Sequence, residues 1–293
     1  MNVLLRDNKL GTRGALFSAN FGLGLLDEAI NIIRRGPIPK HIAFIMDGNR
    51  RYAKAYGIPT AKGHYLGAEA MSNVIEGCFL CGVKGVTVYA FSLENFNRSK
   101  GEIDQLMKLF KFQIHEICKP GGLAERFQAS IRVLGQVGLL DEDLEELLLQ
   151  TMADTQNRVG GFINCCVAYT SRDEIVTAMR RAVRSSRLRH SSADITDEVL
   201  TRYMYTADDP AVNVLVRTSG VSRLSDFLLW QCHEDTDIQI VDAMWPEFGI
   251  YHLFLVILRW QRKQVYIGQA NIQKAAYDKK NLLIWDIVLD AKS

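Results

Sequence analysis

The stretch HIAFIMDGNRRYAK, residues 41–54, joins an apolar run to a polar turn and a basic helix start. Residues 41–46 are apolar apart from the first, and the run stops at Asp47. The Gly-Asn pair that follows allows a sharp turn, because glycine adopts backbone conformations that other residues avoid. Two adjacent arginines then open a helical pattern. The stretch therefore predicts a strand, a turn and a helix, with one acid at the end of a buried strand.

Similar apolar runs recur along the chain, and helical patterns separate them. The runs are short and almost uniformly apolar, which is typical of parallel strands buried on both faces. We therefore predict an α/β fold with an open, mostly parallel six-stranded sheet and helices on both faces. The predicted strands are residues 41–46, 86–91, 130–135, 162–169, 212–216 and 238–242.

The helical patterns carry recognisable ends. Gly82 predicts the C-cap of a helix over residues 67–82. Ser99, with Glu102 three residues later, predicts the start of a helix that continues to about Cys118. Further amphipathic patterns predict helices within residues 25–35, 139–157 and 172–186.

Composition excludes several classes of protein. The 293 residues carry a net charge of +2 and are 48% hydrophobic and 23% charged, which indicates a globular protein and argues against a nucleic-acid binder. Of six cysteines, Cys78 and Cys81 form a CxxC pair without a second pair, so reduced thiols are favoured over a zinc site. No apolar run reaches the length of a membrane span, and we expect a protein without a transmembrane segment.

The chain divides into a long central region and two distinct ends. We predict an N-terminal segment at residues 1–36, a catalytic domain at residues 37–261 and a C-terminal tail at residues 262–293. The amphipathic pattern LLDEAINIIRR predicts a helix that either docks on a membrane or packs on the sheet, and the sequence leaves both open.

Polar residues gather after three of the predicted strands. Asp47 to Arg51 follow the first strand, Ser92 to Arg98 follow the second, and residues 217–226 follow the fifth. Ligands of open α/β sheets bind outside the carboxyl ends of the strands. These three clusters therefore predict one site at one edge of the sheet.

The residue types at these strand ends favour a phosphate ligand. Arg51, Arg98, Arg217 and Arg223 can make charge-assisted hydrogen bonds to phosphate, and two pairs of arginines suit two diphosphates. The lone Asp47 fits as a Mg²⁺ ligand that bridges to a diphosphate. The alternative is a scaffold in which the arginines form salt bridges to the acids of the same stretches, Asp47, Glu94 and Asp226.

At these residues the sequence resembles the cis-prenyltransferases, the family of undecaprenyl and dehydrodolichyl diphosphate synthases. Five separated blocks within residues 37–260 occur in the order of that family, and the form of the first block resembles the eukaryotic dolichol-type catalytic subunits. The blocks are residues 41–54, 63–64, 86–99, 217–231 and 245–248.

The resemblance implies repeated condensation of isopentenyl diphosphate onto an allylic diphosphate such as farnesyl diphosphate, with cis double bonds. The product would be a long polyprenyl diphosphate, dehydrodolichyl diphosphate for dolichol and protein glycosylation. An apolar tunnel would hold the growing chain. Its candidate lining on the helix of residues 101–117 is Leu106, Leu109, Phe110 and Ile114, for which plain core packing is the alternative.

The resemblance also assigns roles to the strand-end residues. Asp47 would be the Mg²⁺-linked catalytic acid, and Asn95 is the candidate for proton removal. An amide is a poor base, so Asn95 could act by position while a diphosphate oxygen takes the proton. The allylic diphosphate would lie at Gly48, Asn49, Arg50, Arg51, Tyr52 and His64, the junction at Ser92, Glu94, Phe96 and Arg98, and isopentenyl diphosphate at Arg217, Arg223, Leu224 and Ser225.

Departures from the family pattern concern the metal and the partner. Thr60 stands where bacterial members carry an arginine, and the second metal ligand is left open among Glu234, Asp235 and Asp237. The C-terminal Arg-x-Gly motif of the family is absent, which implies a heteromer with an accessory subunit resembling the Nogo-B receptor; a homodimer is the alternative. The resemblance places the protein peripherally on the cytosolic face of the endoplasmic reticulum membrane.

Two other functions compete with the enzyme. One is a non-catalytic accessory subunit with the same fold, although such a subunit would not need Asp47 and three polar clusters. The other is a protein that binds a diphosphate ligand without turnover.

Overall fold

The computed structural model describes residues 23–188 and 195–269. Parts of the predicted N-terminal segment and C-terminal tail, at residues 1–22 and 270–293, lie outside the described residues. None of the helices in the described ranges is both long enough and apolar enough to cross a membrane.

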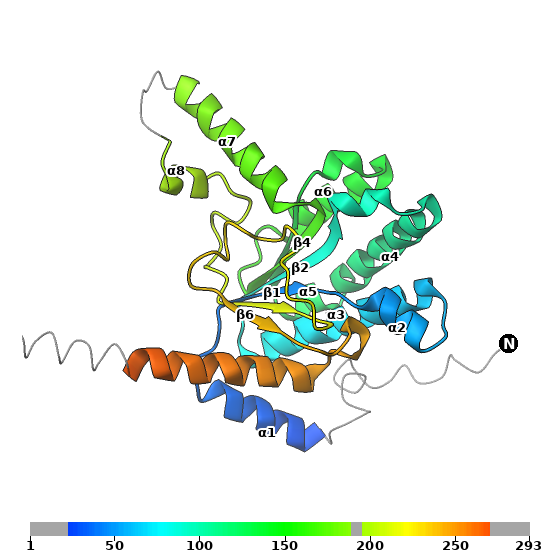
Figure 1. The fold of residues 1–293 in the computed structure, drawn as a ribbon, viewed down its shortest axis with the longest axis vertical. Coiled ribbons are helices and arrows are strands. Elements are labelled where there is room, and N and C mark those ends of the chain that lie inside the picture. Colours follow the sequence, from blue (N-terminus) through cyan, green and yellow to red (C-terminus); the bar gives the residue numbers. More distant parts are fainter. Residues whose placement is uncertain (1–22, 189–194, 270–293) are drawn as a thin grey trace, which may run out of the picture.

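A six-stranded, entirely parallel sheet forms the centre of the molecule, in the order β3-β4-β2-β1-β5-β6 (Figure 1). The α/β prediction is confirmed, and all six strands overlap the predicted runs. The strands are β1 (His41–Ile45), β2 (Gly85–Ser92), β3 (Ala129–Leu134), β4 (Gly161–Tyr169), β5 (Val214–Arg217) and β6 (Asp237–Ile240).

Helices cover both faces of this sheet, as predicted. The helices are α1 (Leu23–Arg34), α2 (Asn49–Ala55), α3 (Thr60–Cys81), α4 (Lys100–Cys118), α5 (Leu123–Arg126), α6 (Glu142–Thr155), α7 (Ser171–Leu188), α8 (Asp197–Thr201) and a final helix over residues 250–269. Short 3-10 helices are η1 (Leu93–Asn97), η2 (Val137–Leu139) and η3 (Trp245–Glu247).

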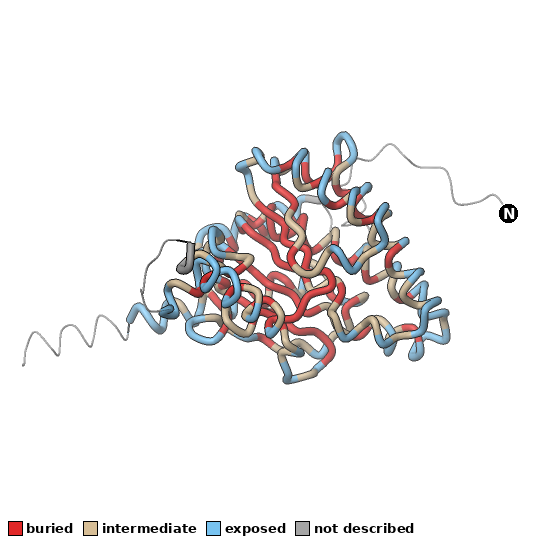
Figure 2. Tube along the Cα trace, turned by 90° about the horizontal axis from the view of Figure 1, so that it is seen from above, coloured by how far each residue is buried: buried red, intermediate tan, exposed pale blue. Residues whose placement is uncertain are grey.

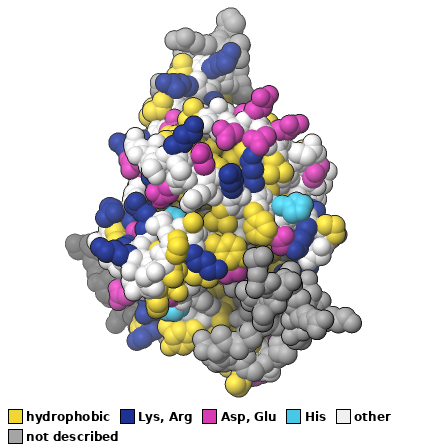
Figure 3. All heavy atoms as spheres, turned by 90° about the vertical axis from the view of Figure 1, so that its right-hand side faces the viewer, with side chains coloured by type: hydrophobic (Ala, Val, Ile, Leu, Met, Phe, Trp, Pro, Cys, Tyr) yellow, Lys and Arg dark blue, Asp and Glu magenta, His cyan; other side chains and the backbone are white. Residues whose placement is uncertain are grey.

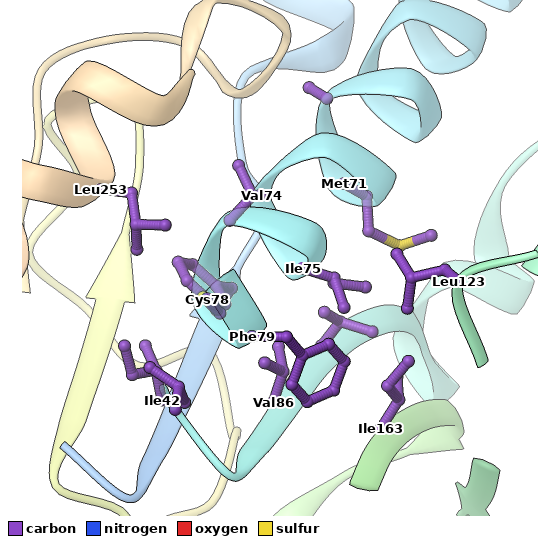
Figure 4. Close-up of a cluster of buried hydrophobic side chains, with 14 of the residues drawn as sticks. Ile42, Met71, Val74, Ile75, Cys78, Phe79, Val86, Leu123, Ile163 and Leu253 are labelled. Carbon is purple, nitrogen blue, oxygen red and sulfur yellow. The ribbon is translucent and has the colours of Figure 1, made fainter. Parts of the chain in front are cut away.

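Side chains on the two faces of each strand enter different cores. On β1, Ile42 and Phe44 join the larger core with α1, α3, α4, α6 and the final helix, whereas Ala43 and Ile45 face the smaller core beside α7 and α8. The strands form the buried centre of the molecule (Figure 2). In the larger core, α3 directs side chains such as Val74 and Ile75 toward the sheet (Figure 4). This burial on both sides explains the uniformly apolar strand sequences.

Two predicted helix caps are confirmed, although the helix predicted over residues 67–82 begins earlier, at Thr60. Gly82 closes α3 with a left-handed φ of 98°, and the Ser99 side chain accepts a hydrogen bond from the Glu102 N–H at the start of α4. The helix predicted within residues 139–157 is α6, which starts later, at Glu142. The 3-10 helix η2 ends at Leu139, and Asp141 is the N-cap of α6.

Helix α1 packs on the protein. Leu26, Ile30 and Ile33 are buried in the larger core, and α1 lies beside the final helix (Figure 1). The Gln261 side chain donates to the carbonyl oxygens of Ile33 at 2.8 Å and Pro37 at 2.9 Å. The final helix continues through residue 262, the predicted start of the tail, to residue 269.

Candidate active site

The carboxyl ends of three neighbouring strands, β2, β1 and β5, bring the predicted polar clusters together. Asp47 follows β1, Ser92 ends β2, and Arg217 ends β5. Because the three strands are parallel and adjacent, their ends meet at one edge of the sheet. The three predicted clusters therefore form a single site.

Asp47 lies at the centre of this site and contacts both arginine clusters. Its Oδ2 accepts a hydrogen bond from Arg217 Nη2 at 2.8 Å, across 170 residues of sequence, and its Oδ1 lies 3.2 Å from Arg51 Nη2. The Asp47 N–H donates to Thr218 Oγ1 at 2.9 Å, and its carbonyl accepts from the Trp245 N–H at 3.0 Å. The backbone of Asp47 is thus fixed while 29% of its side chain stays exposed.

The arginines keep Asp47 ionised. Partial burial acts to raise the pKa of Asp47, but hydrogen bonds and charge from Arg217, and then from Arg51, outweigh it and hold the pKa below its usual value. The carboxylate is therefore negatively charged near neutral pH. Of the three acids in the scaffold alternative, Asp47 is the one that pairs with these arginines, through both of its oxygens.

Close packing fixes the turn after β1. Gly48 has a φ of 113°, and a Cβ at this position would lie 3.0 Å from Met244 Cα, so only glycine fits without strain. Gly67 on α3 lets the Asn49 side chain approach, because a Cβ there would lie 2.1 Å from Asn49 Oδ1. Asn49 Oδ1 is buried without a hydrogen-bond partner among the described residues.

The basic residues of α2 differ in their surroundings. Arg50 is exposed, whereas Arg51 reaches the other cluster, with Nη1 donating to the Ser219 carbonyl at 3.3 Å. Tyr52 is half-buried and packs on the ring of Tyr56 at 4.4 Å between centroids. Arg51 thus joins the site, while Tyr52 supports the helix that carries it.

His64 and Arg98 meet through an acid that sequence reasoning did not assign to the site. Arg98 Nη1 donates to Glu102 Oε1 at 3.0 Å, and His64 Nε2 lies 3.6 Å from the same oxygen. Burial lowers the pKa of His64, and the charge of Arg98 adds to this effect. His64 is therefore neutral near pH 7. The sequence pattern places Glu102 only at a helix cap.

The segment after β2 is held by its own side chains. Asn95 Oδ1 accepts a hydrogen bond from the Ser92 N–H at 3.1 Å and caps η1. Phe96 packs edge-on against Phe91 at 5.0 Å between centroids. The Glu94 side chain is 67% exposed and lies 3.5 Å from Arg172, another residue that sequence reasoning did not assign. Because the Asn95 oxygen is engaged, this geometry favours a positional role for that side chain.

The segment after β5 folds back onto Arg217. Arg217 Nη1 donates to Ser225 Oγ at 2.7 Å and to the carbonyl of Arg223. The Arg217 side chain is only 3% exposed, whereas Arg223 and Ser225 are exposed, and Leu224 packs against the smaller core. The predicted isopentenyl diphosphate residues therefore lie together, with one buried and two exposed.

An apolar cavity of about 100 Å³ extends from this site between α3 and α4. Leu106, Leu109 and Phe110 line it with Met71 and Trp245, whereas Ile114 is buried in the larger core and does not. A neighbouring cavity of about 220 Å³ lies at Tyr65 and Lys108. Hydrophobic side chains also gather on the side of the molecule that carries α2 and α4, with charged side chains around them (Figure 3).

The candidate second metal ligands do not join Asp47 in this chain. Glu234 and Asp235 line a different cavity, which also contacts His41 at the start of β1. Asp237 begins β6, where Lys263 pairs with it at 2.9 Å. Among the described residues, no group of three or more His, Cys, Asp or Glu side chains could hold a metal ion.

A family model described as undecaprenyl diphosphate synthase matches residues 45–268. The chain belongs to the cis-prenyltransferase family. The match confirms the family resemblance found in the sequence, and it covers every residue of the candidate site.

Individual cis-prenyltransferases resemble the chain over most of its length. A human dehydrodolichyl diphosphate synthase complex subunit is 41% identical over 256 residues, covering 86% of this chain and 76% of the human one. A complex subunit of the same description from Schizosaccharomyces pombe is 39% identical over 233 residues, covering 79% of this chain and 88% of the relative. A tritrans,polycis-undecaprenyl-diphosphate synthase of Methanocaldococcus jannaschii is 36% identical, covering 84% of this chain and 87% of the relative.

Solved cis-prenyltransferase structures share the fold. Lavandulyl diphosphate synthase from Lavandula x intermedia, solved with dimethylallyl diphosphate, superposes with a TM-score of 0.70 at 27% identity, covering 76% of this chain and 95% of that one. A probable undecaprenyl diphosphate synthase from Campylobacter jejuni, at 24% identity and a TM-score of 0.63, shares the fold as well, covering 77% of this chain and 96% of that one.

Proposed function

We propose that this chain elongates an allylic diphosphate, such as farnesyl diphosphate, by repeated cis addition of isopentenyl diphosphate. The product is a long polyprenyl diphosphate, dehydrodolichyl diphosphate for dolichol and protein glycosylation. The proposal depends above all on one observation: Asp47 lies between two arginine clusters, 3.2 Å from Arg51 and 2.8 Å from Arg217. Relatives from human and fission yeast that bear the name dehydrodolichyl diphosphate synthase complex subunit support it.

The two arginine clusters suit two substrates. The turn and helix after β1, from Gly48 to Tyr52, with His64, bind the allylic diphosphate. Arg217, Arg223, Leu224 and Ser225 bind isopentenyl diphosphate, and Ser92, Glu94, Phe96 and Arg98 line the junction. Holding both substrates beside each other converts a bimolecular step into an effectively unimolecular one. Preorganised donors also stabilise the charge that develops on the departing diphosphate.

Asp47 is the proposed Mg²⁺ ligand. Magnesium is commonly held by one or two carboxylates together with substrate phosphates, and a single ionised, partly exposed carboxylate fits that pattern. When bound, the ion neutralises charge on the allylic diphosphate. Arg217 and Arg51 pair with the two Asp47 oxygens, so at least one of these pairings would have to open for Asp47 to hold the ion.

Asn95 positions the junction, and a diphosphate oxygen accepts the proton that leaves isopentenyl diphosphate. An uncharged amide is a poor base, and Asn95 Oδ1 already accepts the Ser92 N–H. The apolar cavity between α3 and α4 receives the hydrocarbon chain as the start of a tunnel. Leu106, Leu109 and Phe110 form one of its walls.

The active form is a heteromer with an accessory subunit resembling the Nogo-B receptor. The human and fission-yeast relatives are named as subunits of a complex, which supports this proposal. A homodimer remains the alternative. The complex acts peripherally on the cytosolic face of the endoplasmic reticulum membrane, where Leu25 and Ile32 of α1, 65% and 53% exposed, offer apolar contact.

Incubation with labelled isopentenyl diphosphate, farnesyl diphosphate and Mg²⁺ tests these proposals. The chain is assayed alone and with the accessory subunit, and lipid products are separated by length. Long products from the pair alone support the heteromer. Product from the isolated chain would contradict an obligate heteromer, and no lipid product in any combination would overturn the enzyme in favour of a binding protein without turnover.

A further inference from the structure

The N-terminus of α7 holds the loop that follows the isopentenyl diphosphate residues. The Ser171 N–H donates to the Asp226 carbonyl at 2.8 Å, and the Leu229 N–H donates to Ser171 Oγ at 3.0 Å. Arg172 engages both carboxylate oxygens of Asp226, with its backbone N–H 3.1 Å from Oδ1 and its Nε 2.7 Å from Oδ2. One end of α7 thus fixes the loop through backbone and side chain together.

This loop requires external support because its backbone is unusual. Ser225, Asp226 and Leu228 have φ values of 51°, 60° and 45°, in the left-handed region that residues other than glycine rarely adopt. Such conformations persist only where surrounding contacts determine them. Among these three residues, Asp226 has the charged side chain, and only 9% of that side chain is exposed.

The supported loop carries a proposed substrate contact. Ser225 precedes Asp226 directly, and its Oγ accepts the hydrogen bond from Arg217 at 2.7 Å. The Tyr89 hydroxyl lies 3.3 Å from the Ser225 carbonyl and 3.1 Å from the Tyr169 carbonyl, so it ties the same loop to the end of β4. A displacement of Asp226 would therefore move Ser225 away from Arg217, which itself contacts Asp47.

Arg172 also contacts the junction. Its Nη2 lies 3.5 Å from Glu94 Oε1, one residue before Asn95. Both side chains of this pair are largely exposed, at 73% and 67%, so the pair by itself contributes little to stability. Its position matters more, because one guanidinium group touches both the junction and the loop that carries Ser225.

We infer that Arg172 and Asp226 are positioning residues, a clamp that holds Ser225 and Arg217 in the geometry that binds isopentenyl diphosphate. The clamp links that geometry to the junction through Glu94. Neither residue is assigned to substrate contact. The inference rests on the proposed binding of isopentenyl diphosphate at Arg217 and Ser225.

Steady-state kinetics of the complex tests the clamp with Asp226→Asn, Arg172→Ala and the double variant. Asp226→Asn keeps the shape of the side chain but loses its charge. We expect each single variant to raise the KM for isopentenyl diphosphate by about tenfold, the equivalent of one charge-assisted hydrogen bond. The KM for farnesyl diphosphate should change by less than about twofold. The double variant should be little worse than either single one, since the residues act as a pair.

Matched variants separate the clamp from general damage. Arg180→Ala removes an exposed arginine from the same helix and should leave every kinetic constant unchanged. Arg172→Lys keeps a positive charge near Glu94 but loses the Nε donor, so it should raise the KM for isopentenyl diphosphate like Arg172→Ala. Thermal unfolding identifies variants that fail to fold. If Arg172→Ala or the double variant fails to fold, the kinetic comparison uses the conservative variants Asp226→Asn and Arg172→Lys.

Arg217→Lys distinguishes failure of the clamp from failure of the proposed site. If Arg217→Lys raises the KM for isopentenyl diphosphate while the folded clamp variants do not, the clamp is overturned and the site stands. If Arg217→Lys leaves that KM unchanged, the site itself is wrong. Equal rises in the KM of both substrates for the clamp variants would also overturn the inference, because they would indicate a loss of structure without specificity.

Discussion

The two ends of the sheet use polar side chains in opposite ways. At the carboxyl end, Asp47 is partly exposed and pairs with Arg51 and Arg217, and we propose that a ligand takes the place of one of these partners. In the amino half, His41, Thr87 and Asn164 are fully buried and hydrogen-bond one another, with His41 Nε2 2.7 Å from Thr87 Oγ1 and Asn164 Nδ2 3.1 Å from it. Asn164 Nδ2 also donates to Asp209 Oδ2 at 2.7 Å.

The difference shows what separates a binding site from structural polarity. Most polar atoms of the buried amino half pair with one another, because an unpaired one is costly away from water; Asn164 Oδ1 has no partner among the described residues. A site that binds a ligand must instead keep some of its polar groups accessible, as Asp47 is, even where a neighbour such as Arg217 is buried. The polar residues of the carboxyl end should therefore govern turnover, and those of the amino half should govern stability.

The largest expected effect concerns Asp47. Asp47→Asn should reduce turnover by about 10²–10³-fold, because it removes the charge proposed to hold Mg²⁺ at the developing diphosphate charge. Incorporation of labelled isopentenyl diphosphate by the complex measures it, with unchanged thermal unfolding as the control. A variant that kept wild-type turnover would contradict the role given to the carboxyl end.

The second prediction concerns the amino half. Asp209→Ala should lower the free energy of unfolding by about 2–3 kcal/mol, because it leaves Asn164 and Arg132 without their shared partner. Denaturant titration measures the loss, and the neighbouring exposed Asp208→Ala should cost little. Turnover per folded molecule should not change. An Asp209→Ala variant that kept its stability but lost turnover would contradict the assignment of the amino half to stability.

Arg51 lies at the carboxyl end, so it should affect substrate binding and leave stability almost unchanged. Its effect should be smaller than that of Asp47. Arg51→Ala should raise the KM for farnesyl diphosphate by about tenfold through loss of a charge-assisted hydrogen bond. Its side chain is 52% exposed, so the free energy of unfolding should be almost unaffected. Lys54→Ala, an exposed cation on the same helix, provides the control. Equal rises in the KM for farnesyl diphosphate in both variants would show that Arg51 contributes only general surface charge.

The smallest effect is a pH dependence of stability. Burial lowers the pKa of His41 below its ordinary value of about 6.5, against opposing contributions from the Pro210 carbonyl and Asp209. Below about pH 6.5 the unfolded chain therefore binds a proton that the folded chain does not, so the free energy of unfolding falls as the pH falls. His64 and His252 act in the same direction.

Urea titrations at pH 7.5 and pH 5.5 measure this dependence. His41→Gln should weaken the pH dependence by up to about 1.4 kcal/mol per pH unit, the contribution of one titrating group. His115→Gln gives a matched control at an exposed histidine. An unchanged dependence in His41→Gln would show that His41 is not a buried neutral group.

The sequence predicted the strands well because most of them, above all β1, β2, β4 and β5, are buried on both faces and therefore almost uniformly apolar. It predicted the caps at Gly82 and Ser99 because those depend on single residues. It did not assign Arg172, Glu102 or Trp245 to the site, since their contacts with Asp226, His64 and Asp47 span distant segments. Ile114 likewise had the same helical spacing as the cavity residues but packs in the core.

By itself, the sequence determined the class of fold, the acid at the end of the first strand and the two arginine clusters, because these follow from local patterns of apolarity and charge. Only the tertiary structure decided the strand order that joins Arg217 to Asp47 across 170 residues, and the clamp of Arg172 on Asp226. Pairing of distant segments depends on packing of the whole chain, and no local pattern encodes it.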